Sequence, residues 1–163
     1  MTPDARAELL LSYARGPELL REVVAACPEE ALDFKPGPGK WSVRDIVFHL
    51  AESELHGYCR ARFIMAEPGV TILPFDQDRW AAALDPAAHP LEEALVLFRL
   101  LRELMARQLR GVPEGLWKQT IRHPERGDID LDRWLGIYEA HLKVHLAQIQ
   151  RTVSAWKGAA IVR

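Results

Sequence analysis

Two histidines near the C-terminal end of the chain, His141 and His145, have the spacing of a metal-binding pair on a helix. The segment from Ile137 to Lys157 contains no proline or glycine, so we expect it to be helical and to present both imidazoles on one face. Side chains four residues apart on a helix have Cβ atoms about 5–6 Å apart, which allows two ring nitrogens to bind one ion at about 2.0–2.1 Å. Two interior histidines that hydrogen-bond to side chains or water would show the same spacing.

The residues around this pair predict that it points into the interior of a bundle. At about 100° per residue, the face that carries the histidines also carries aromatic and polar residues: Trp134, Tyr138, Gln148 and Thr152. The opposite face is polar, and we expect it to contact water: Asp132, Glu139, Lys143 and Gln150. Because an unsatisfied buried polar group costs about 1–3 kcal/mol, both imidazoles need partners, and one metal ion would satisfy both.

A second helix with an unusual polar face is predicted from Ser42 to about Ala66. Ser42 can cap its first turn, and Asp45 can return the hydrogen bond. His49 lies on a stripe that mixes polar and apolar residues: Asp45, Ile46, Glu52, Ser53, His56, Arg60, Phe63 and Ile64. The far side carries Arg44, Glu54, Tyr58 and Arg62. The stripe suggests a polar cavity, although a second solvated face would give the same pattern.

Two further helical segments are predicted from apolar residues that recur at intervals of three and four. One runs from Asp4 to Cys27, with a kink at Gly16-Pro17, and the other runs from Pro90 to about Leu109. The helix that carries His141 should open near Asp130. Four amphipathic helices in one chain predict an all-α, four-helix bundle that forms a single domain over residues 1–163.

The connections between the predicted helices are rich in proline and glycine. The longest, from Pro68 to Pro90, joins the second helix to the third, and its length is typical of lids and pocket walls. We expect a short helix within it, from Asp76 to Leu84. The segment from Glu114 to Ile129 reads as a loop, and no alternating pattern predicts a strand anywhere in the chain.

Composition excludes several classes of partner. The net charge of −2 comes from 21 basic and 23 acidic residues without a basic block, which disfavours binding to nucleic acid. No apolar run approaches the roughly 18–20 residues of a membrane span, and the N-terminus lacks the apolar core of a signal peptide, so we expect a cytoplasmic protein without membrane contact. Cys27 and Cys59 form no Cys-x-x-Cys pair and are expected to be packing residues.

The two segments that carry the histidines resemble the signature motifs of the DinB/YfiT-like superfamily. Residues 40–54, KWSVRDIVFHLAESE, resemble the first motif, in which a Trp-Ser start leads to His-Leu-Ala. Residues 141–149, HLKVHLAQI, resemble the second motif, two histidines four apart followed by Gln-Ile. The segments 76–80 and 123–127 are also similar to members of this group, so the resemblance covers nearly the whole chain.

The resemblance implies a four-helix bundle that holds one divalent metal ion, most often zinc or nickel. One histidine of the second helix and two of the fourth are the ligands, which by position are His49, His141 and His145. Three nitrogen ligands leave at least one position for water or substrate, as in catalytic rather than structural zinc sites. Relatives in this group often form dimers, so the resemblance also allows a homodimer.

We therefore expect a metal-dependent enzyme that acts on a small molecule. Some relatives are transferases that use a low-molecular-weight thiol such as bacillithiol or mycothiol as cosubstrate, and others are named as hydrolases. We slightly favour thiol transfer over hydrolysis, because the resemblance includes relatives with that activity. The alternative is a non-catalytic, metal-stabilised scaffold or small-molecule-binding bundle, and the charge balance argues against direct action on DNA.

Several other polar residues have candidate roles. Glu52, one turn after His49, is the candidate catalytic base or a partner that orients a ligand, and a surface ion pair is its alternative. His56 could line the pocket or be satisfied by a neighbour. Tyr138 and Gln148 are expected to pack and hydrogen-bond across the bundle rather than orient a ligand. Two histidines that precede proline in loops are expected to be structural: His89 and His123.

Overall fold

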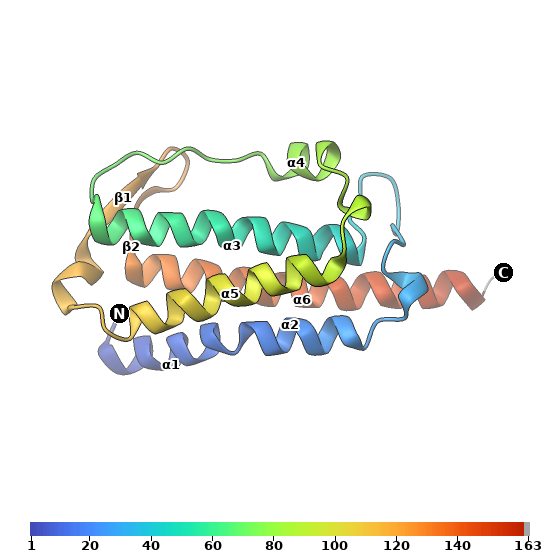
Figure 1. The fold of residues 1–163 in the computed structure, drawn as a ribbon, viewed down its shortest axis with the longest axis horizontal. Helices are drawn as coiled ribbons and strands as arrows, with labels where there is room; N and C mark the ends of the chain where they lie inside the picture. Colours follow the sequence, from blue (N-terminus) through green and yellow to red (C-terminus); the bar gives the residue numbers. More distant parts are fainter. Residues whose placement is uncertain (162–163) are drawn as a thin grey trace.

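Four helical segments run side by side in the computed structural model, which describes residues 1–161 (Figure 1). They are α1 (Pro3–Ala14) followed by α2 (Gly16–Ala25), α3 (Val43–Ala66), α5 (Leu91–Leu109) and α6 (Leu131–Ile161). The predicted all-α four-helix bundle is confirmed. Residues 162 and 163, the end of the single domain predicted from the sequence, lie outside the described part of the chain.

The first helical segment is broken at the predicted place. Arg15 ends α1, and Pro17 lies in the first turn of α2, so the two helices follow one another nearly in line (Figure 1). Gly16 is buried at this break, and a Cβ atom there would overlap the guanidinium group of Arg102 from α5. A glycine at the break therefore leaves the space that this arginine occupies.

Helix α3 packs against both α5 and α6. Its start is fixed by the predicted capping box, in which Ser42 Oγ accepts from the Asp45 N–H at 3.1 Å and an Asp45 carboxylate oxygen accepts from the Ser42 N–H at 2.9 Å. Asp45 is thus a residue of the helix start, as expected. The helix ends at Ala66, where the sequence places its end.

A buried ion pair links the helices in the middle of the bundle. Arg102 Nε donates to Glu54 Oε2 at 2.9 Å, and the Tyr13 hydroxyl donates to the other oxygen of Glu54. Arg102 also donates to the main-chain carbonyl oxygens of Tyr13 at 3.2 Å and Tyr138 at 2.6 Å. The sequence had shown no chemistry on the third predicted helix and had placed Glu54 only on the far side from His49, so this cluster is a finding of the structure.

The face of α6 opposite the histidines was predicted to contact water, and this prediction is wrong for two of its residues. Asp132 is 7% exposed and accepts from Arg6 Nε at 2.7 Å, and Glu139 is also 7% exposed and accepts from Ser12 at 2.6 Å. Helix α1 covers this face and supplies partners from the other end of the chain. The polar pattern was read as solvated because no local feature of the sequence shows those partners.

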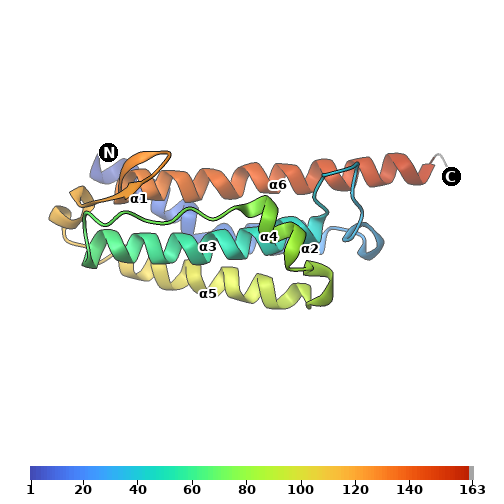
Figure 2. The ribbon, with the colours of Figure 1, turned by 90° about the horizontal axis from the view of Figure 1, so that it is seen from above.

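The long connection between α3 and α5 runs back along α3 (Figure 2). It contains the predicted short helix, α4 (Gln77–Ala83), and a single 3-10 turn, η2 (Pro86–Ala88); another such turn, η1 (Glu29–Ala31), precedes α3. Phe75 stacks on His56 of α3, with 4.1 Å between ring centroids, and Trp80 packs against both rings. Aromatic contacts therefore attach the start of α4 to α3.

The segment from Glu114 to Ile129 is not the loop that the sequence predicted. It forms a 3-10 helix, η3 (Glu114–Lys118), and an antiparallel hairpin of β1 (Thr120–His123) and β2 (Gly127–Asp130). The turn is completed by Gly127, which has a φ of +70°. Each strand has only four residues and one buried apolar side chain, Ile121 or Ile129, so no alternation long enough to read was present.

The connection after α3 is hydrogen-bonded to this hairpin. The Gly69 N–H donates to the Thr120 carbonyl oxygen at 2.7 Å, and the Ile72 N–H donates to that of Arg122 at 3.0 Å. The Arg122 N–H donates to the Val70 carbonyl oxygen at 2.9 Å. Within residues 1–161, no helix combines the length and apolarity that crossing a membrane requires.

Close approach of α3 and α6 depends on Gly57. Trp134 Nε1 donates to the Gly57 carbonyl oxygen at 2.9 Å. The ring of Tyr138 fills the space beside the Cα atom of Gly57. We predict that Gly57→Ala lowers the free energy of unfolding by about 1–3 kcal/mol, because a Cβ atom there would overlap that ring.

Gly136→Ala is the matched control for this prediction. Gly136 lies in α6, and a Cβ atom there would meet nothing within 4 Å, so alanine should raise the free energy of unfolding by about 0.5–1 kcal/mol. Urea denaturation of both variants measures the two effects. Equal stability of the two variants would contradict the close approach.

Candidate metal centre

Three histidines from two helices point at one another in the bundle. His49 comes from α3, and His141 and His145 come from successive turns of α6. His141 Nε2 lies 3.1 Å from the Nε2 atom of His49 and 3.1 Å from that of His145. The three candidate ligand atoms all lie within 4.8 Å of one another, so the structure brings together the three histidines singled out in the sequence.

These distances match the shape of a metal site. Nitrogens bound tetrahedrally at 2.0–2.1 Å from one zinc ion would be about 3.3 Å apart. Hydrogen bonds among the rings satisfy the cluster less well, because each neutral imidazole has one N–H and the His141 Nε2 atom faces two other ring nitrogens. The donor set present, three imidazole nitrogens, suits zinc and nickel.

Neighbouring side chains fix the orientation of two of the rings. His145 Nδ1 lies 2.8 Å from Gln148 Oε1, so its N–H can donate there and leave the lone pair of Nε2 facing the cluster. The Trp41 ring packs against His49 and is stacked on His145, with centroid distances of 4.7 and 6.2 Å. Gln148 thus orients a candidate ligand, a role that the sequence reasoning had ranked below packing.

The site keeps its imidazoles uncharged. Burial, with a smaller contribution from the neighbouring histidines, lowers the pKa of His49 to about 4 and that of His141 to about 3. Burial also lowers the pKa of His145, although the hydrogen bond with Gln148 acts in the opposite direction. Neutral imidazoles are the form that binds a metal ion. His49 Nδ1 is buried and has no hydrogen-bond partner among residues 1–161.

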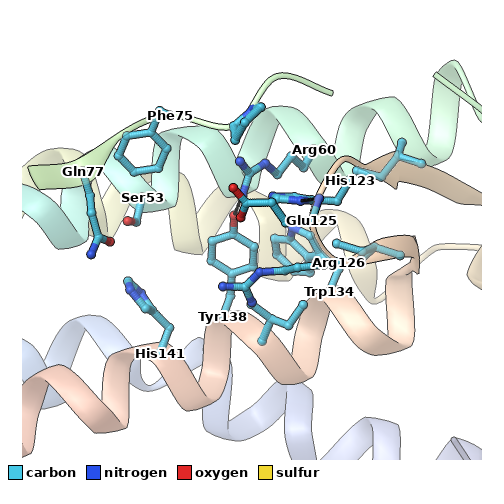
Figure 3. A pocket seen from close by; sticks show the side chains of 14 residues that line it. Ser53, Arg60, Phe75, Gln77, His123, Glu125, Arg126, Trp134, Tyr138 and His141 are labelled. Atoms are coloured by element: carbon cyan, nitrogen blue, oxygen red, sulfur yellow. Dashed lines mark hydrogen bonds between the residues drawn. The ribbon is translucent and has the colours of Figure 1, made fainter. Parts of the chain in front are cut away.

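A cavity of about 310 Å³ opens beside His141 (Figure 3). Helices α3 and α6 form its floor, and the hairpin and residues 74–77 form its walls. The side chains that line it are mixed: Ser53, Arg60, Pro74, Phe75, Gln77, Ile121, His123, Glu125, Arg126, Ile129, Trp134, Ile137, Tyr138 and His141. A small molecule in this cavity would reach the histidine cluster from the side of His141.

The other predicted site residues lie in different places. Glu52 does not line this cavity but a separate pocket, with Phe48 and His89 on its wall, and burial raises its pKa. Its role as a catalytic base stays a prediction. His56 packs between α3 and the connection, and its Nε2 atom has no partner within the described chain. His123 is buried and accepts from the Glu125 N–H at Nδ1, which is a structural role for that ring.

Sequence reasoning did not single out the two arginines of the cavity. Arg60 had been placed on the stripe of His49 without a role, and Arg126 had been assigned to a loop. The helical spacing of Arg60 from His49 was the available signal, since eleven residues is close to three turns. Nothing local in the sequence points to Arg126, because only the hairpin brings it to α6.

One protein-family model matches most of the chain. The model of the DinB superfamily matches residues 12–149, a range that includes all three histidines of the cluster. The chain belongs to the DinB superfamily. The resemblance seen in the two histidine motifs is thereby confirmed.

Curated relatives and a solved structure agree with this membership. The chain is 35% identical over 133 residues to a protein of Oceanobacillus iheyensis, covering 82% of this chain and 77% of the relative. It is 31% identical over 142 residues to a protein of Geobacillus kaustophilus, covering 85% and 79%. Both relatives carry the name "putative metal-dependent hydrolase".

The structure of YfiT from Bacillus subtilis superposes with a TM-score of 0.87 at 25% identity, covering 93% of this chain and 87% of YfiT. It is described as a "probable metal-dependent hydrolase" with an unusual four-helix bundle topology. The shared superfamily and the superposition show that this bundle is DinB/YfiT-like.

The contact between Gln148 and His145 can be tested with added zinc. Gln148→Leu should weaken zinc binding about 10–100-fold, because groups that orient a ligating imidazole have effects of that size. Gln150→Leu is the control, since Gln150 is exposed on the same helix. Competition with a chromophoric zinc chelator measures both affinities, and equal affinities would show that Gln148 does not orient His145.

Proposed function

We propose that this protein is a metal-dependent enzyme that acts on a small molecule, with His49, His141 and His145 as the ligands of one divalent ion. The convergence of three neutral imidazoles, with Nε2 distances of 3.1 Å, is the observation that supports this most directly. The names of the relatives support the dependence on metal. Zinc or nickel is the ion that we propose, because imidazole nitrogen binds both and the resemblance of the histidine motifs implies one of the two.

The position of the cavity favours catalysis over a purely structural ion. Structural zinc sites are closed by four protein ligands, whereas the cluster here offers three and borders an open cavity. The volume of about 310 Å³ lies at the lower end of the range for small-molecule pockets. We infer that the substrate is a small molecule held against α6.

A bound divalent ion would lower the pKa of a water or thiol ligand and polarise an oxygen of the substrate. The residues of the chain would position the reactants. Trp41 and Gln148 hold the rings of the ligands, and Ser53 lies both on the cavity and 3.4 Å from His49 Nε2. Phe75 and Trp134 supply apolar walls that exclude water from a bound substrate.

Water is the nucleophile that we propose first. The relatives named above are described as hydrolases, whereas the preference for thiol transfer came from the resemblance alone. Transfer to or from a low-molecular-weight thiol remains the second candidate within the same site, since the ion would activate either nucleophile. A non-catalytic, metal-stabilised bundle is the alternative from another class.

The metal content of untagged protein tests the ligand assignment. We expect about one equivalent of zinc or nickel by mass spectrometry in the wild type, and its loss in His141→Ala, because two nitrogens hold an ion much less tightly than three. His89→Ala, which removes an exposed histidine outside the cluster, should keep the ion. Wild-type protein that contains no ion and cannot be reloaded would refute the assignment.

Turnover separates an enzyme from a scaffold. Metal-loaded protein would be assayed with activated aryl esters and phosphates for hydrolysis, and with a thiol plus an aryl halide for thiol transfer. We expect turnover in one arm, reduced at least about 100-fold by chelation or by His141→Ala while the circular dichroism spectrum is unchanged. Absence of turnover in both arms, together with a melting temperature that falls on chelation, would support the scaffold instead.

A further inference from the structure

The cavity beside His141 contains two positive charges without an ion-pair partner. Arg60 from α3 and Arg126 from the turn of the hairpin both line it, and both point into the space beside Tyr138 (Figure 3). Arg60 is half-buried, whereas Arg126 is exposed. In residues 1–161 the other buried or half-buried arginines are paired: Arg6 with Asp132, Arg44 with Asp33, Arg99 with Glu103 and Arg102 with Glu54. In the described part of the chain, Arg60 and Arg126 form no such pair.

Arg60 is held in place by one hydrogen bond that leaves most of its donors free. Its Nη1 atom donates to the hydroxyl oxygen of Tyr138 at 3.2 Å. Tyr138 lines the cavity and precedes His141 by about one turn of α6, so this bond fixes the guanidinium at the part of the cavity beside Tyr138. A guanidinium has five N–H donors in a planar fork, and the remaining donors of Arg60 have no partner among residues 1–161.

The charge of the cavity is positive as a whole. Of its lining residues, Glu125 alone is acidic, against the two arginines. A divalent ion on the histidine cluster would increase the positive potential further. An anion would therefore be more stable here than a neutral molecule of the same size.

We propose that the substrate of this site carries a carboxylate or phosphate-like group that Arg60 and Arg126 bind together. This inference rests on the function proposed above and names the class of substrate. Planar guanidinium forks match the oxygens of carboxylate and phosphate, which gives orientation as well as affinity. With the anionic group held beside Tyr138, the rest of the molecule extends along α6 toward His141. The arginines thus determine which molecules present a reactive bond to the cluster.

Binding of simple aromatic anions tests this proposal. Benzoate and phenylphosphonate are suitable probes because Phe75 and Trp134 supply apolar walls, and benzamide is the neutral isostere of benzoate. Ligand-detected NMR titrations would compare wild type with Arg60→Gln, Arg126→Gln and the double variant. Each single variant should weaken binding of the anions about tenfold or more, and benzamide should bind weakly to all of them. The two anions distinguish a carboxylate site from a phosphate site.

Three further variants are controls for the comparison of anion binding between wild type and the arginine variants. Arg122→Gln removes an exposed arginine of the same hairpin that does not line the cavity, and it should bind the anions like wild type. Arg60→Lys keeps the charge without the fork and should recover part of the affinity. Glu125→Gln removes the acidic residue of the cavity and should tighten binding. Circular dichroism and melting temperature establish that each variant is folded.

The same titrations on metal-free wild type and on His145→Ala separate anion binding from metal binding. His145 is a candidate metal ligand, but it does not line the cavity. Anion binding that depends on Arg60 and Arg126 in these samples supports the inference even where no ion binds. Equal binding of benzamide and benzoate would overturn it. Affinity that survives the double variant, or that appears only with zinc, would also overturn it while leaving the metal-dependent function intact.

Discussion

The buried ion pair between Arg102 and Glu54 constrains how the helical segments of this protein meet. Their side chains are only 1% and 3% exposed, and a charge left alone at such depth would destabilise the fold by about 3–5 kcal/mol. Arg102 also donates to the carbonyl oxygens of Tyr13 and Tyr138, and Gly16 leaves room for its guanidinium. One side chain of α5 therefore contacts α1, α3 and α6, and none of these helices can shift along its axis without leaving a buried polar group unpaired.

The histidine cluster depends on the same constraint. Glu54 follows His49 on α3 by five residues, and Tyr138 precedes His141 on α6 by three, so the groups that Arg102 holds lie within about two helical turns of the candidate ligands. Packed interiors change position in discrete steps rather than continuously, which keeps the ring nitrogens within reach of one ion. The three candidate ligands thus lie on the packed helices of the bundle, whereas the hairpin and the connection after α3 supply the cavity walls.

The sequence predicted those features that depend on interactions between residues close to one another in the chain. His141 and His145 share a face through helical periodicity, and the start of α3 is set by residues three positions apart, so both were predictable from short windows. Asp132 was misread as solvated because its partner, Arg6, lies at the other end of the chain. The hairpin was missed because its strands are too short to show alternation, and its arginine at the cavity, Arg126, was missed with it. Interactions between distant segments carry no signature in a local pattern.

The two walls of the cavity are joined by main-chain hydrogen bonds, from Gly69 and Ile72 to the first strand of the hairpin and from that strand back to Val70. Main-chain hydrogen bonds of this kind form with almost any side chain at these positions, since every residue except proline has the same amide and carbonyl groups. Substitutions in the walls can then accumulate without loosening them. Proteins with this scaffold can change their substrate selectivity by exchanging wall residues such as Phe75 while the three histidines stay the same. The range of substrates can then change without a change in the chemistry of the histidine cluster.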